Sequence, residues 1–113
     1  MSRLLAAVLV FAGCAAAPMR TPATREARNV RAELSQLEAR VAVLMRDEIA
    51  PLSVEKRTSQ RCARVEAAAA EICDAAERIC RLADELADEP AARSCTRARN
   101  DCRHAHEIAT SCR

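Results

Sequence analysis

The chain has 113 residues, of which 50% are hydrophobic but only 1% aromatic, and its formal net charge is +2. A net charge this close to zero lacks the excess of basic residues that is typical of proteins that bind nucleic acid. Aromatic side chains supply most large anchors of ligand pockets, so their near absence argues against a small-molecule substrate. One glycine and four prolines also argue against a loop-rich fold. The helical patterns described below make an all-α chain the expectation.

Residues 1–13 predict an export signal. They contain one positive charge at Arg3, nine apolar residues from Leu4 to Ala12, and small residues before a break. The apolar run is too short for a membrane-spanning helix, which needs about 20 residues. The ending Phe11-Ala12-Gly13-Cys14 resembles the lipobox of bacterial lipoproteins, in which the signal is cleaved before the cysteine.

This resemblance implies a lipid on Cys14, with diacylglycerol on its sulfur and an acyl group on its amine. Several acyl chains anchor a protein stably, whereas one binds reversibly. Residues 14–23 then form a lipidated tether, because they carry two prolines and no apolar period. In lipoproteins the absence of Asp at the next position, here Ala15, implies sorting to the outer membrane, facing the periplasm or the surface. Ordinary secretion with cleavage after Ala17, or a cytosolic chain, are the alternatives.

Residues 24–51 predict an amphipathic, coiled-coil-like helix. Thr24 is a suitable N-cap, with Glu26 in the first turn. The apolar residues recur at alternating steps of four and three, at Val30, Leu34, Leu37, Val41 and Leu44. The pattern fails at Glu48, and Pro51 is expected to end or kink the helix. The stripe needs a partner, which is either the rest of the chain in a three-helix bundle or a second copy in a self-associated stalk.

Residues 52–113 predict a helical hairpin stapled by disulfides. One helix is expected from about Ser53 to about Ala87, and Asp88-Glu89-Pro90 reads as the turn that starts the next. Six cysteines lie in the two arms in mirror order, and the nested pairs have residue numbers that sum to about 175 each, as antiparallel helices require. Although six cysteines alone leave many connectivities open, this spacing selects Cys62–Cys112, Cys73–Cys102 and Cys80–Cys95. An oxidising compartment, where exported proteins fold, allows such bonds to persist.

The residues around these cysteines agree with the pairing. A disulfide needs Cα atoms about 4.4–6.8 Å apart, closer than ordinary helix packing, and the intervening positions are mostly Ala, which allows close approach. The first arm is net acidic and the second net basic. A second stripe of bulky apolar residues lies beside the cysteine positions on the same predicted helix, and another helix must cover it. Its members are Val65, Ile72, Ile79 and Leu86.

Two further resemblances bear on function. The paired-cysteine hairpin is similar to the twin-cysteine coiled-coil-helix domains of mitochondria, which implies a stapled architecture and no shared role. Thiols along helices also resemble those of bacterial copper-storage proteins, which makes periplasmic copper or zinc binding the alternative function. The seven-residue spacing differs from the CxxC or CxxxC that brings two thiolates to one ion, and His104 and His106 are expected on nearly opposite sides of their helix.

No metal ligand, cofactor or catalytic residue is therefore predicted. A redox enzyme would need a CxxC motif or a lone activated thiol, and a phosphate loop would need more glycine than Gly13. The sequence favours a lipid-anchored protein of the bacterial cell envelope with a structural or protein-interaction role and no catalysis.

Overall fold

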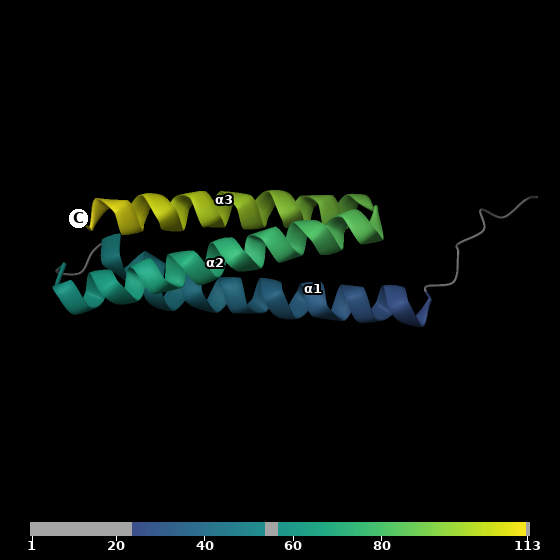
Figure 1. Ribbon diagram of the computed structural model, residues 1–113, viewed down its shortest axis with the longest axis horizontal. Coiled ribbons are helices and arrows are strands. Elements are labelled where there is room, and N and C mark those ends of the chain that lie inside the picture. Colours follow the sequence, from purple (N-terminus) through teal and green to yellow (C-terminus); the bar gives the residue numbers. More distant parts are fainter. Residues whose placement is uncertain (1–23, 54–56, 113) are drawn as a thin grey trace, which may run out of the picture.

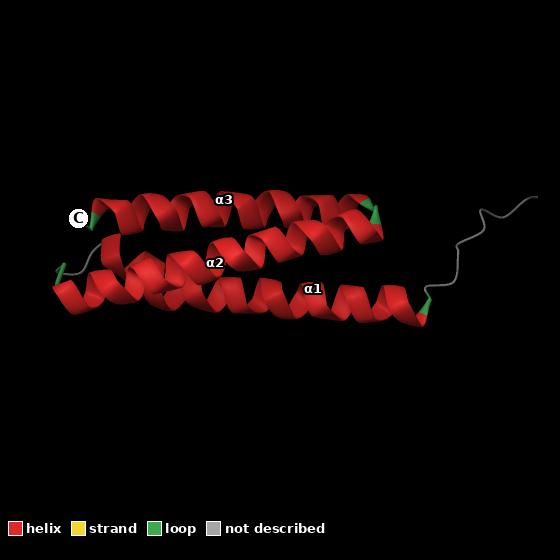
Figure 2. Ribbon diagram, in the orientation of Figure 1, coloured by secondary structure: helices red, strands yellow, loops and turns green. Residues whose placement is uncertain are grey.

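The computed structural model describes residues 24–53 and 57–112, and nearly all of them are helical (Figures 1 and 2). The all-α prediction is confirmed for these residues, which include no strand. The expected signal and tether, and with them Cys14, lie outside the described residues. The elements in chain order are α1 (Arg25–Leu44), the π-helix η1 (Met45–Ile49), the 3-10 helix η2 (Ala50–Ser53), α2 (Ser59–Leu86) and α3 (Glu89–Ser111).

The three long helices lie side by side, and α2 is the one that the other two share. Figure 1 shows α1 and α3 running in the opposite direction to α2. Helix α3 packs most extensively on α2, α1 packs on α2 as well, and α1 and α3 contact each other much less. The chain therefore makes two antiparallel helix pairs with α2 in common.

Helix α1 begins as its sequence predicts. The Thr24 hydroxyl accepts a hydrogen bond from the Ala27 N–H at 3.0 Å, so the expected N-cap is confirmed. The helix was expected to reach Pro51 and to end or kink there, and its α-helical part ends earlier, at Leu44. After Leu44 the backbone widens into η1, and Pro51 lies in the tighter η2 that follows.

The π-helix explains why the apolar period fails at Glu48. A π-turn holds more residues than an α-turn, so it shifts every later side chain around the helix axis. The position facing the core after Leu44 is consequently Ile49, which is 1% exposed, and then Leu52, which is 2% exposed. The apolar stripe does not stop at Glu48 but continues one residue out of phase.

Helix α2 begins later than expected, at Ser59 instead of near Ser53. Thr58 has an extended backbone, and its hydroxyl accepts a hydrogen bond from the Arg61 N–H at 3.1 Å, which caps the helix. The helix ends at Ala87, which adopts a left-handed conformation with φ of 53°. Glycine is the usual residue there, because a Cβ is crowded in this region.

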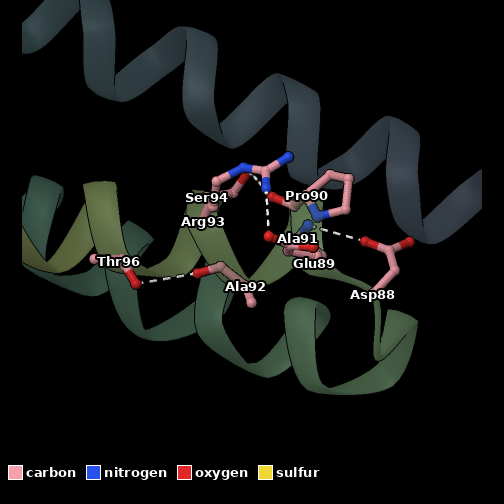
Figure 3. A network of polar contacts seen from close by, with 8 residues as sticks. All are labelled: Asp88, Glu89, Pro90, Ala91, Ala92, Arg93, Ser94 and Thr96. Carbon is pink, nitrogen blue, oxygen red and sulfur yellow. Dashed lines mark hydrogen bonds and ion pairs between the residues drawn. The ribbon is translucent and has the colours of Figure 1, made fainter.

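The turn into α3 confirms the predicted start of that helix. The Asp88 carboxylate accepts a hydrogen bond from the Ala91 N–H at 2.9 Å, and Pro90 lies in the first turn, where its missing N–H has no partner to lose (Figure 3). The nearby Ser94 hydroxyl is buried and donates to the Pro90 carbonyl at 3.2 Å. The hairpin turn therefore takes two residues, Ala87 and Asp88, between α2 and α3.

The core is built unevenly. The large buried apolar side chains come from α1, η1, η2 and α2, whereas the buried residues of α3 are small and its larger Ile108 is only partly buried against the core. Among the largest fully buried side chains are those of Ile49, Leu52, Val65, Ile72 and Ile79. The core therefore centres on the contact between α2 and the N-terminal helices.

Candidate functional site

The cysteines form a structural centre, which we call the disulfide seam: the three bridges Cys62–Cys112, Cys73–Cys102 and Cys80–Cys95. The structure joins them in the nested order that the spacing predicts. The Cα atoms are 5.6 Å apart in the first bridge and 4.6 Å apart in the other two. Each bridge joins α2 to the end or the body of α3, so the seam runs along the whole hairpin.

Alanine lines the seam between the bridges, and this permits the short distance between the helices. The alanines at the expected seam positions are buried, at Ala69, Ala76, Ala83, Ala91, Ala98, Ala105 and Ala109. Ala87 is the exception, because its left-handed backbone ends the helix and leaves the residue exposed. Larger side chains at these positions would separate the helices beyond the reach of a disulfide.

The apolar stripe of α1 lies against α2. Leu34, Val41 and Leu44 are buried, and Val30 and Leu37 are partly buried against the same core. The bulky stripe of α2 provides the other side, since Val65, Ile72 and Ile79 are fully buried and Leu86 is partly buried. Within this chain, each of the two stripes that needed cover therefore covers the other.

Three ion pairs join α1 and η1 to α2, and we call them the charged ladder: Glu33–Arg78, Arg40–Glu71 and Glu48–Arg64. The Arg40 Nε lies 2.7 Å from the Glu71 carboxylate, and the Arg64 guanidinium lies 2.8 Å from Glu48. This ladder was not predicted from the sequence. Its signal was nonetheless present, because the residue numbers in each pair sum to about 111, the second antiparallel register in the chain.

The charges in the ladder alternate in sign along each helix. From N- to C-terminus, α1 and η1 present an acid, a base and an acid, and α2 presents a base, an acid and a base. A slip of one heptad would place like charges opposite one another. Exposed pairs contribute little stability individually, but this alternation distinguishes the correct register from the slipped ones.

The turn of the hairpin is also tied to α1. The Arg31 guanidinium hydrogen-bonds the Asp88 carboxylate that caps α3. The hydrogen bond from Arg31, followed by that from the Ala91 N–H, lowers the pKa of Asp88 below its ordinary value. One residue therefore serves both the start of α3 and the contact with α1.

A small hollow lies between α1 and α3, with a volume of about 230 Å³, and its lining includes Glu38, Val41, Arg97 and Asp101. The Arg97 guanidinium is 3.8 Å from the Glu38 carboxylate, and partial burial raises the pKa of Asp101. Val41 is only 3% exposed, so the hollow exposes little of this side chain.

The described residues include no group of three or more His, Cys, Asp or Glu side chains that could hold a metal ion. His104 and His106 are both exposed on α3. The six cysteines of the seam are disulfide-bonded, and a disulfide sulfur is not the thiolate that binds copper or zinc.

No family model, curated protein or solved structure matches this chain. Across the described ranges 24–53 and 57–112, every helix is too short or too polar to cross a membrane.

Proposed function

We propose that this chain is a lipid-anchored protein of the bacterial cell envelope, with a structural or protein-interaction role and no catalysis. The observation that carries the proposal is the disulfide seam. Three bridges along an alanine interface belong to a protein that folds in an oxidising compartment. The lipobox-like ending at Cys14 supports export to the same compartment and supplies the anchor.

The body is best explained as a three-helix bundle within one chain. The α1 stripe and the charged ladder support this over a stalk of parallel copies. In a parallel stalk, the flanking residues Glu33 and Arg40 would face flanking positions of the next copy and would have no designated partner on α2. Against α2, each finds the opposite charge. The alternative, a stalk, predicts self-association through Val30, Leu34, Leu37, Val41 and Leu44. These residues would then have to leave their contact with α2.

A charge-reversal cycle tests the bundle. Arg40→Glu and Glu71→Arg each place like charges together and should lower the urea midpoint of unfolding. The double variant should recover most of that loss, because the pair is restored with its signs exchanged. Arg99→Glu is the matched control, since Arg99 is exposed on α3 outside the ladder. Failure of the double variant to recover, together with a dimer or larger species in sedimentation, would favour the stalk.

Mass spectrometry of the protein purified from bacterial membranes tests the anchor. We expect a lipid-modified N-terminal peptide starting at Cys14, and Cys14→Ala should release the protein into the soluble fraction. An unmodified N-terminus at Pro18 would show ordinary secretion instead.

Non-reduced peptide mapping of the same sample separates the proposal from its alternative. The structural role requires the three linked peptides and no free thiol among the six seam cysteines. Six free thiols would support metal binding, and titration with copper or zinc would then measure how many ions the chain takes up.

A further inference from the structure

The two helix pairs that share α2 are held together by different means. The buried residues of α3 are all small, at Ala91, Ser94, Ala98, Ala105 and Ala109. The N-terminal helices instead bury Leu34, Val41, Leu44, Ile49 and Leu52. Since hydrophobic stabilisation follows the apolar area removed from water, each large residue that the N-terminal helices bury gains more than each small residue that α3 buries, although α3 packs more extensively on α2.

The charged groups follow the same division. Every pair of the charged ladder joins α1 or η1 to α2, and no member of the ladder lies on α3. Two ion pairs connect α1 to the other end of the chain, Arg31–Asp88 at the turn and Arg97–Glu38 at 3.8 Å. The disulfide seam, in contrast, acts only between α2 and α3.

We propose that the disulfide seam is a redox latch that holds α3 on an otherwise self-sufficient pair of helices, α1 and α2. A dithiol reductant attacks one sulfur of a bridge, forms a mixed disulfide, and leaves as its own disulfide. Each bridge gains two electrons and two protons and becomes two thiols, and opening the seam consumes three equivalents of dithiol. With the bridges open, the alanine interface does not hold α3, whereas the apolar stripes and the charged ladder keep α1 on α2.

Release of α3 changes the surface of the protein. The face of α2 that it covers carries small residues at Ala69, Ala76 and Ala83, and this face becomes accessible together with the new thiols. The oxidised chain is therefore the closed state, and the reduced chain is an open state in which this face of α2 is uncovered.

Hydrogen exchange of the full chain, read by mass spectrometry with and without excess dithiothreitol, tests the latch. On reduction we expect the amides of α3 to exchange at least about 100-fold faster, and those of α1 and α2 to change by less than about 10-fold. Circular dichroism should lose about a third of the helical signal, because isolated helices of this length are marginal in water. A loss of protection in all three helices together, or continued protection of α3, would overturn the proposal.

Two variants separate the latch from general unfolding. Replacing all six seam cysteines by alanine should reproduce the open state without reductant. Arg40→Glu breaks an ion pair that joins α1 to α2 and involves no residue of α3, so in the oxidised protein it should speed exchange in α1 and leave α3 protected by its bridges. Equal acceleration in α1 and α3 for Arg40→Glu would show one cooperative unit and would contradict the latch.

Discussion

The outer bridge of the seam offers the sharpest test of how the staples stabilise this small protein. The change is the double substitution Cys62→Ala and Cys112→Ala, which removes one bridge and leaves the other two. Both sulfurs lie in half-buried residues at the end of the hairpin, and alanine matches the residues that already line the seam. Little native packing is therefore lost, and the effect should arise mainly in the unfolded state.

The magnitude follows from the nesting. The bridges span 15, 29 and 50 residues, so the outer bridge closes a further loop of about 21 residues, the difference between 50 and 29. In the chain-entropy description a loop of that size corresponds to about 3 kcal/mol of stability. Removing the inner bridge Cys80–Cys95 instead merges two short loops of the unfolded chain into one. The stability that this bridge contributes through chain entropy is therefore smaller, about 2.5 kcal/mol. Cys80 is nevertheless more buried than the cysteines of the outer bridge.

Urea unfolding followed by circular dichroism measures both variants. The outer variant should lose about 3 kcal/mol, and its dependence on urea should steepen, because the less constrained unfolded chain exposes more surface. The variant Cys80→Ala with Cys95→Ala is the comparison, since it removes a bridge without opening the end of the hairpin. A loss below about 1 kcal/mol for the outer variant, with unchanged urea dependence, would refute the unfolded-state reasoning.

Three further outcomes are expected. Ala87→Gly should raise the stability by up to about 1 kcal/mol in urea melts, because glycine adopts the left-handed backbone without crowding, and a lower midpoint would contradict this. Ile79→Ala should cost about 2–5 kcal/mol, since the side chain is 0% exposed, whereas Val43→Ala, at 36% exposed, should stay within about 0.5 kcal/mol. Because the Arg31 hydrogen bond lowers the folded pKa of Asp88, its contribution is present above the ordinary pKa of 3.8 and is lost as pH falls through the lower folded value. Asp88→Asn should therefore flatten the acid end of a stability–pH profile, and an unchanged slope below about pH 4 would argue against the pair.

Local sequence signals determined the hairpin. The mirror spacing of the cysteines predicts which residues face one another, because heptad-spaced positions share a helix face and antiparallel helices keep the sum of paired numbers constant. The caps at Thr24 and Asp88 were also readable, since each depends on a side chain and an amide only three residues away. The register of Cys73 with Cys102 needed no knowledge of the rest of the chain.

The contact of α1 with α2 depended on residues far apart in sequence. Nothing local to Glu48 predicts that a π-turn will pass the apolar stripe on to Ile49, because that turn is favoured by what Ile49 and Leu52 bury against.

The sequence by itself therefore determined the helical class, the pairing of the cysteines and the turn between α2 and α3, since propensities, caps and heptad spacing act over a few residues or along one helix face. Only the tertiary structure decided what covers the α1 stripe. Its apolar period fits α2 and a second copy equally well, and the choice rests on which opposite charges and which core side chains meet across the interface. In this chain the charged ladder and the continuation of the stripe through Ile49 favour α2.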